Sequence, residues 1–209
     1  MSLQGKRVCI DPGHPSEVGS GTRGKKITEI QAAWRVALKL QKLLTDAGAK
    51  VVLTKKSENE MVKNRKRAEI ANEFKADLAV RLHCDSEASA GFAVYYPTRQ
   101  GRAADGGVGP SPDVLKKCKA VAPVFYKGFS TGMRGGPLKD RGLKSDLETS
   151  VGGKQGALTG SIYSKIPVVL IEMCVLTNAK DDAYMASEAG QQFVAESLHA
   201  GCVEALSVM

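Results

Sequence analysis

The amino-acid sequence predicts a single α/β domain with a mostly parallel central sheet flanked by helices. Short apolar runs alternate with longer segments in which apolar residues recur at helical spacing, and this alternation is typical of parallel sheets built from strand–helix–strand units. Residues 166–173 (IPVVLIEM) form an almost continuous apolar run, as expected of a strand buried on both faces. No internal repeat or linker divides the 209 residues. We therefore expect one domain over residues 1–209, with its core from about 6 to 208.

The first half of the chain predicts four strands and two helices. Residues 7–10 (RVCI) and 49–54 (AKVVLT) are short apolar runs that predict strands. Between them, apolar residues recur at helical spacing over 28–47, with Thr28 as the N-cap and Gly48 as the stop signal. A basic amphipathic helix is expected over 64–74, followed by strands at 77–82 (DLAVRL) and 92–96 (FAVYY).

The second half begins with a loop rich in Gly and Pro, residues 98–113, which ends at a helix cap, Ser111 or Asp113. The helix after this cap is expected to run to about residue 127, and a final helix is expected over 189–206. Residues 145–164 (SDLETSVGGKQGALTGSIYS) are rich in Gly, Ser and Thr. This composition favours a mobile loop or hairpin over a packed helix.

Composition and charge narrow the class of protein. Hydrophobic residues make up 43% and charged residues 25%, which are ordinary values for a globular protein. The formal net charge of +8 suits an anionic partner, but the basic residues are scattered and aromatic residues are only 5%, so nucleic-acid binding ranks last. We find no apolar run long enough to cross a membrane and no secretory signal in the N-terminal residues MSLQGKRVCIDPGH.

The five cysteines indicate a chain made in a reducing compartment. Their number is odd and no CxxC motif occurs, so we interpret them as small buried apolar residues. Cys84 directly follows His83, which leaves a metal-ligand or nucleophile role as the minor alternative for that residue.

Two histidines follow predicted strands. His14 follows the first strand in VCIDPGH, and His83 follows the third in VRLHCDS. Because the carboxyl ends of parallel strands meet at one edge of a sheet, we expect the two histidines to lie together there. The third histidine, His199, lies in the last predicted helix and is interpreted as a surface or packing residue.

Two glutamates complete a possible site. Glu29 opens the first helix, and Glu172 ends the apolar run VVLIE, where an acid is costly to bury without a partner. Two histidines and one carboxylate form a catalytic zinc set with one position left for water, and a second carboxylate would act as general base. The alternatives stay open at this point: a favourable helix-dipole charge for Glu29, and a solvent-facing acid for Glu172.

Motifs along nearly the whole chain resemble one enzyme family. The motifs are IDPGH, TEI at a helix start, RAEIAN, DLAVRLHCDS, GFAVYYP, KDRGLK and VVLIEMCVLTN. In this order they resemble the zinc-dependent N-acetylmuramoyl-L-alanine amidases of the amidase-3 type. The resemblance implies a phosphorylase/hydrolase-like α/β fold. It also implies hydrolysis of the amide between N-acetylmuramic acid and L-alanine in peptidoglycan.

The resemblance implies roles for four residues. His14, Glu29 and His83 match the ligands of one zinc ion per chain, and Glu172 matches the catalytic glutamate. The implied mechanism is metal-assisted hydrolysis, in which Glu172 takes a proton from water and returns it to the leaving amine. A zinc peptidase or amidase acting on another small amide is one alternative. A non-catalytic wall-binding module with the same fold is another.

The chain departs from the usual family pattern at several positions. DPGHGG becomes DPGH followed by Pro15, and SIHAN becomes RLHCD, which places Arg81 and Asp85 beside His83. Asp85 and Asn178 are candidate residues near the metal or the substrate. Asp11 is a candidate for orienting a ligand histidine or, equally, for capping the turn.

The expected partner is peptidoglycan, and we expect no nucleic acid, no membrane insertion and a monomer. The protein would act at the bacterial cell wall, which it would reach by release on lysis or by export as part of a longer protein. We expect residues 145–164 to form part of the rim of the substrate cleft. They contain no long amphipathic helix that could plug the site, so we expect an uninhibited enzyme.

Overall fold

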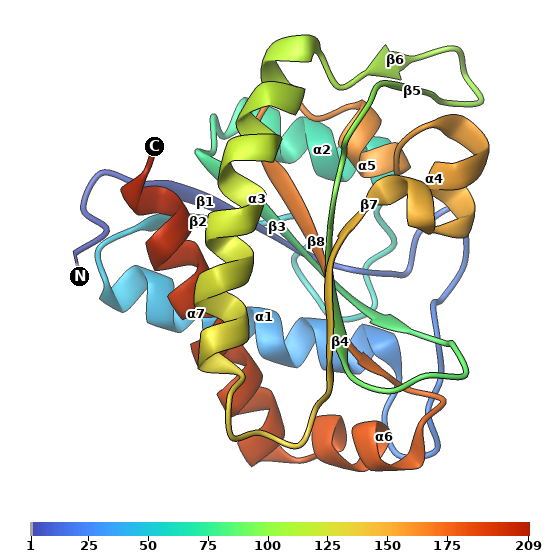
Figure 1. Ribbon diagram of the computed structural model, residues 1–209, viewed down its shortest axis with the longest axis vertical. Helices are drawn as coiled ribbons and strands as arrows, with labels where there is room; N and C mark the ends of the chain where they lie inside the picture. Colours follow the sequence, from blue (N-terminus) through green and yellow to red (C-terminus); the bar gives the residue numbers. More distant parts are fainter. Residues whose placement is uncertain (1) are drawn as a thin grey trace.

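A six-stranded sheet crosses the centre of the molecule (Figure 1). The computed structural model describes residues 2–209. The strands of the sheet are β1 (Arg7–Pro12), β2 (Lys50–Leu53), β3 (Leu78–Asp85), β4 (Phe92–Tyr96), β7 (Asp140–Ser145) and β8 (Val168–Val175). Their order is β2-β1-β3-β8-β4-β7. A short ladder of β5 (Gly101–Arg102) and β6 (Val108–Gly109) lies apart from this sheet.

The prediction of a mostly parallel sheet is confirmed. β1 pairs in parallel with β2 and β3, and β3 pairs in parallel with β8. β4 is antiparallel to β8 and parallel to β7. The strands β1, β3 and β8 therefore present their carboxyl-terminal halves side by side in the middle of the sheet.

The helices form two unequal layers. They are α1 (Glu29–Asp46), α2 (Asn64–Glu73), α3 (Pro112–Gly132), α4 (Ser150–Gln155), α5 (Thr159–Ile162), α6 (Ala179–Ala186) and α7 (Glu188–Ser207), with a 3-10 turn, η1 (Asp146–Glu148). The long helices α1, α3 and α7 pack together on one side of the sheet (Figure 1) and bury the main apolar core against it. The short helices α2 and α5 contact each other on the opposite side.

The strand residues explain why the two faces differ. Val8, Ile10, Val80, Leu82 and Ile171 alternate along their strands toward the large core. On the opposite face, β1 and β3 carry Asp11, Arg81 and His83, while β8 carries Glu172. The polar side chains thus lie on the face that the long helices leave uncovered.

Local signals in the sequence account for most element boundaries. Thr28 caps α1, as predicted, and forms a capping box with Gln31. Ser111 caps α3, which extends to Gly132 rather than to about residue 127. β3 continues to Asp85, so His83 lies within this strand and not after it. The polar residues His83 and Asp85 give no strand signal of their own, and pairing with β8 extends β3 over them.

Two further features differ from the sequence prediction. Residues 145–164 form η1, α4 and α5, so the expectation of a loop or hairpin without helix is wrong. Their side-chain caps explain the outcome, since Ser145 and Thr149 each accept a hydrogen bond from a backbone N–H at a helix start. Helix α6 was also not predicted; Asn178 caps it.

The prediction that the cysteines are buried is confirmed. All five cysteines are free and buried, consistent with small apolar residues in the core. No helix in residues 2–209 has the length and apolar character needed to span a membrane.

Candidate active site

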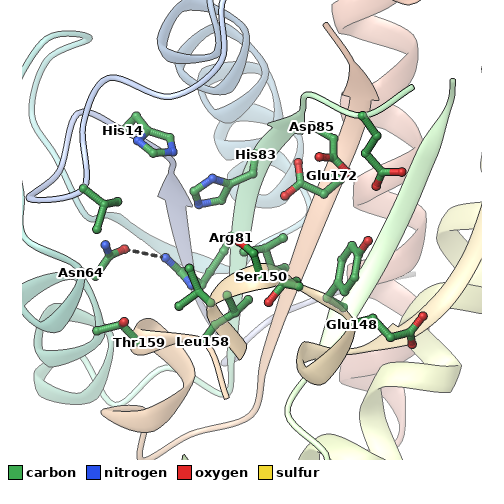
Figure 2. Close-up of a pocket in the computed structure, with 16 residues that line it drawn as sticks. His14, Asn64, Arg81, His83, Asp85, Glu148, Ser150, Leu158, Thr159 and Glu172 are labelled. Carbon is green, nitrogen blue, oxygen red and sulfur yellow. Dashed lines mark hydrogen bonds between the residues drawn. The ribbon is translucent and has the colours of Figure 1, made fainter. Parts of the chain in front are cut away.

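A cleft of about 510 Å³ opens on the face of the sheet opposite the long helices. β3 contributes Arg81, His83 and Asp85 to its lining, and β8 contributes Glu172 (Figure 2). The loop after β1 adds His14. The structure therefore brings His14, His83 and Glu172 together from three separate parts of the chain.

His14, Glu29 and His83 form a compact cluster with metal-ligand chemistry. One nitrogen or carboxylate oxygen from each lies within 4.8 Å of the others. Glu29 Oε1 is 2.9 Å from His83 Nδ1 and 3.6 Å from His14 Nε2. These separations are close to the ~3.3 Å expected between ligands about 2.0–2.1 Å from a tetrahedral zinc ion.

The loop after β1 holds His14 in an unusual backbone conformation. His14 has a φ of 50°, in the left-handed region that few residues other than glycine adopt. Lys55 Nζ donates to the His14 carbonyl at 2.6 Å, and Arg67 donates to the carbonyls of Pro12 and Pro15. Two buried cations thus fix the carbonyls of the turn and compensate for the strain at His14.

Two glycines let the ligands approach one another. A Cβ on Gly13 would lie 2.6 Å from His83 Cε1, and a Cβ on Gly21 would overlap the Glu29 carboxylate. Gly21 also has a φ of 74°. Glycine is therefore required at both positions, because any larger side chain would push a ligand away.

Glu29 is positioned by the backbone on both sides. Its Oε2 accepts a hydrogen bond from Thr22 N at 2.7 Å, and its Oε1 accepts one from Cys84 N at 3.1 Å. The segment leading into α1 is held by Asp182 on α6, which accepts hydrogen bonds from the backbone N–H groups of residues 25, 26 and 27. The helix-start position predicted for Glu29 therefore turns its carboxylate into the cluster.

The charges in this cluster suit a cation. Burial favours a raised pKa for Glu29, but the hydrogen bond from His83 and the positive charges of the two histidines outweigh it, so the pKa of Glu29 lies below its usual value. Burial lowers the pKa of His83, and this outweighs the opposite effect of Glu29. A lowered pKa favours the ionised form of Glu29, which is the form that binds a metal ion.

The surroundings of His14 also suit a metal ligand. His14 Nδ1 lies 3.0 Å from the Gly19 carbonyl; if that nitrogen carries the proton, Nε2 keeps its lone pair facing the cluster. His83 Nε2 is buried and has no hydrogen-bond partner among the described residues. Because Nδ1 is the ring nitrogen that faces Glu29, at 2.9 Å, Nε2 is not the atom that this cluster would offer to a metal ion.

Glu172 lies in the middle of β8, directly beside the cluster. It is the register partner of His83 across the β3–β8 pair. Burial raises the pKa of Glu172 well above its usual value, and the negative charges of Glu29 and Asp85 add to this effect. Its Oε2 is buried without a hydrogen-bond partner in the described chain. This carboxylate is available to accept a proton from a group in the cleft.

Asp11 serves the fold in a way that neither sequence interpretation anticipated. Its two oxygens accept hydrogen bonds from Thr54, Arg67 and Arg81, at 2.5, 2.7 and 2.9 Å. Within residues 2–209, it forms no hydrogen bond to His14 or His83. The two guanidinium groups hold the pKa of Asp11 far below its usual value, against the opposing effect of burial.

Asp85 lines the cleft on the far side of Glu172. Arg141 donates two hydrogen bonds to Asp85 Oδ2, both at 3.1 Å, and also pairs with Glu87. Burial raises the pKa of Asp85. Glu148, from η1, extends this acidic side of the cleft.

The segment 145–164 forms one wall of the cleft, as predicted. Its residues Glu148, Thr149, Ser150, Val151, Leu158 and Thr159 line the cleft. The buried Asp146 fixes this wall, since its Oδ2 accepts a hydrogen bond from Leu158 N at 3.0 Å and its carbonyl accepts one from Thr149 N. The wall is therefore tied together across its two short helices.

Some site residues differ from the sequence analysis. Asn178 does not line the cleft: it caps α6, accepting hydrogen bonds from Lys180 N and Asp181 N. Sequence reasoning missed the contributions of Asn64 and Tyr95 to the cleft, and that of Asp182 to the position of Glu29. An N-cap followed by acids in the first turn, in NAKDD, was the available signal for α6.

Comparison with known proteins agrees with this geometry. Residues 8–204 match the family described as N-acetylmuramoyl-L-alanine amidase (Amidase_3). The chain is 26% identical over 202 residues to N-acetylmuramoyl-L-alanine amidase LytC of Bacillus subtilis, a match that covers 95% of this chain and 35% of that protein. The chain thus spans about a third of the length of this relative.

Solved structures show the same fold. The catalytic domain of CwlV, an N-acetylmuramoyl-L-alanine amidase from Bacillus (Paenibacillus) polymyxa var. colistinus, superposes with a TM-score of 0.75 at 28% identity, covering 98% of this chain and 99% of that one. The amidase Ami1 from Mycobacterium smegmatis gives a TM-score of 0.79 at 21% identity, with full coverage of both chains. Because the family match extends over nearly the whole chain, this protein belongs to the N-acetylmuramoyl-L-alanine amidase family.

Proposed function

We propose that this chain hydrolyses the amide between N-acetylmuramic acid and L-alanine in peptidoglycan. The observation that carries the proposal is the cluster of His14, Glu29 and His83 with Glu172 beside it, in one cleft of a member of this family. The resemblance seen in the sequence assigns the same four residues, and the geometry supports that assignment.

In this proposal His14, Glu29 and His83 hold one zinc ion. Zinc would supply Lewis acidity, favouring the ionisation of water and polarising the scissile carbonyl. Glu172 accepts the proton from the attacking water and transfers it to the amine of L-alanine as that amine leaves. The raised pKa of Glu172 suits both halves of this task, since a carboxylate with a raised pKa is a stronger base and keeps the proton until the leaving group needs it.

We further propose that residues 1–209 form one catalytic domain that acts as a monomer on peptidoglycan at the bacterial cell wall, reached on lysis or by export within a longer protein. One six-stranded sheet and a shared core support one domain. The formal net charge of +8 favours approach to an anionic wall polymer. Nucleic-acid binding and membrane insertion are not part of the proposal.

Mass spectrometry of digested wall tests the proposal. Purified peptidoglycan incubated with the zinc-loaded protein should release fragments with free L-alanine amino termini, and Glu172→Gln should release none above background. Fragments cleaved between stem-peptide residues instead would show a peptidase, and this result would contradict the proposed bond.

The alternative of a zinc enzyme acting on another small amide is tested with the same protein. Intact sacculi and free stem peptides are offered separately. The proposed amidase should cleave sacculi and leave peptides without a muramoyl group intact. A non-catalytic wall-binding module would bind sacculi without any cleavage; the unpaired Glu172 Oε2 beside the cluster argues against it.

A further inference from the structure

The buried ionic cluster behind the cleft carries more positive than negative charge. Asp11 is paired with two guanidinium groups, Arg67 at 2.7 Å and Arg81 at 2.9 Å. All three side chains are almost fully shielded from solvent. One carboxylate cannot neutralise two guanidinium groups, so the cluster has an excess positive charge in a region of low dielectric constant.

The neighbouring groups leave this excess in place. Lys55 is buried, and burial together with the positive charge of Arg67 lowers its pKa to about 8. Asp146 is close enough for Arg81 to affect its pKa, but forms no ion pair with it, and burial raises that pKa. Asp11 is thus the one carboxylate in contact with Arg81 among the described residues.

Arg81 is the member of the cluster that lines the cleft (Figure 2). Its Nε donates to Asp11 and its Nη2 donates to Asn64 Oδ1 at 2.9 Å. Gly160 of α5 packs on the guanidinium group, because a Cβ there would lie 2.6 Å from Arg81 Cζ and Nη1. Contacts with α2, β1 and the 145–164 wall therefore fix the guanidinium group of Arg81 in one orientation.

The backbone spacing of Arg81 and His83 is comparable to a substrate dimension. Arg81 and His83 point to the same face of β3, two residues apart, or ~7 Å along the strand. The α-carboxylate of the second stem residue, γ-linked D-glutamate, lies one residue beyond L-alanine and thus ~6–7 Å from the scissile carbonyl carbon. A substrate bound at His83 can therefore present this carboxylate to Arg81.

The opposite side of the cleft excludes this anion. Asp85, Glu87 and Glu148 line that side. Arg141 pairs with Asp85 and Glu87 but supplies one positive charge for the three acidic groups, so a carboxylate placed there would face an excess of negative charge. The glycan strand carries no charge once its lactyl group is in amide linkage. The polarity of the cleft therefore directs the acidic peptide toward Arg81 and the glycan toward Asp85.

We propose that Arg81, held by Asn64 and Gly160, binds the free α-carboxylate of the second stem residue, so that the enzyme prefers D-glutamate to its α-amide at this position. The proposal rests on the proposed amidase function and names a specificity determinant of it. The usual family pattern has serine where this chain has Arg81, so the preference belongs to this chain.

Matched muramoyl peptides test the preference. Two substrates differ only at the second residue, which is D-glutamate with a free α-carboxylate or with an α-carboxamide. A hydrogen bond to a charged group predicts a kcat/KM ratio of about 10 to 100 in favour of the carboxylate. Arg81→Gln should bring this ratio near one, and Arg81→Lys should restore part of it. Arg141→Lys, which changes an equally shielded arginine on the acidic side, should keep the ratio.

A second measurement does not depend on how the variants fold. Two free tripeptides, L-Ala-γ-D-Glu-L-Ala and its α-carboxamide L-Ala-D-isoGln-L-Ala, both with the γ-carboxyl in amide linkage, are titrated into the wild-type protein by calorimetry, and the acid should bind about tenfold or more tightly. Cleavage of both substrates at equal kcat/KM, or equal binding of both peptides, overturns the role of Arg81. Absence of cleavage of either substrate and of sacculi contradicts the proposed function instead.

Discussion

Two neighbouring regions of the sheet each contain a shielded carboxylate, and their surroundings are opposite. On β1, Asp11 accepts hydrogen bonds from Thr54, Arg67 and Arg81, and its pKa lies far below the usual value. On β8, Glu172 has one oxygen without a partner in the described chain, and its pKa lies well above the usual value. Both carboxylates are buried, so the presence of charged hydrogen-bond donors around Asp11, and their absence around Glu172, explains the opposite shifts in pKa. A carboxylate with such donors stabilises the fold, whereas one without them is free to carry a proton.

The largest effect is expected at Glu172. Glu172→Gln removes the basic lone pair and keeps the size of the side chain, so turnover on purified peptidoglycan should fall about 10²- to 10⁴-fold. Zinc content should not change, because Glu172 is outside the ligand cluster. Kinetics and elemental analysis of the same preparation measure both quantities. A variant that loses its zinc, or that keeps its rate, would show that Glu172 has another role.

Asp11 should affect stability instead. Asp11→Asn leaves two buried guanidinium groups without their counter-ion, so the free energy of unfolding should fall by about 3–5 kcal/mol. Urea unfolding measures this change. Asp46→Asn, which breaks an exposed pair with Lys42, is the control and should change stability by less than about 1 kcal/mol.

The pH dependence sharpens the contrast. The pKa of Asp11 is lowered in the folded state, so its contribution to stability is complete above the unfolded-state value of about 4 and is lost as the pH falls below it. The difference in unfolding free energy between wild type and Asp11→Asn should therefore be constant from pH 7 to about 5 and narrow at lower pH. A constant difference down to pH 3 would show that the charge of Asp11 does not cause the stabilisation.

Glu29 should separate metal binding from proton transfer. Glu29→Gln removes a charged ligand candidate but not the proton acceptor, so zinc affinity should fall at least about tenfold, and excess zinc should restore part of the activity. Competition with a chelator measures the affinity. If Glu29→Gln keeps both its zinc and its activity, the ligand set is wrong.

The smallest effect is expected at the cleft wall. Replacing residues 150–155 by a short Gly-Ser connection removes Val151 and the rest of α4 from the lining. Loss of about 1 kcal/mol of apolar contact predicts a roughly fivefold rise in KM for wall fragments, with unchanged zinc content. Unchanged digestion would assign the wall a purely structural role.

The sequence predicted the parts of the molecule whose causes are local. The period of apolar residues over 28–47 and the cap Thr28 determine α1, and with it the position of Glu29. The 145–164 wall was not predicted as helical, because its short helices depend on the contact of Asp146 with Leu158 and of Gly160 with Arg81 as well as on their caps. The pairing of Asp11 with Arg67 and Arg81 was also not predicted, since those residues meet only in the folded sheet.

The hydrogen bonds from residues 25–27 to Asp182 determine when the site can form during synthesis of the chain. The backbone groups that place Glu29 are bound by a side chain about 155 residues later in the chain, and Glu172 itself enters the sheet only when β8 pairs between β3 and β4. A nascent chain therefore lacks the completed cluster until β8 and α6 have left the ribosome. Synthesis thus completes the cluster in a single late step, and partial chains released early would lack it.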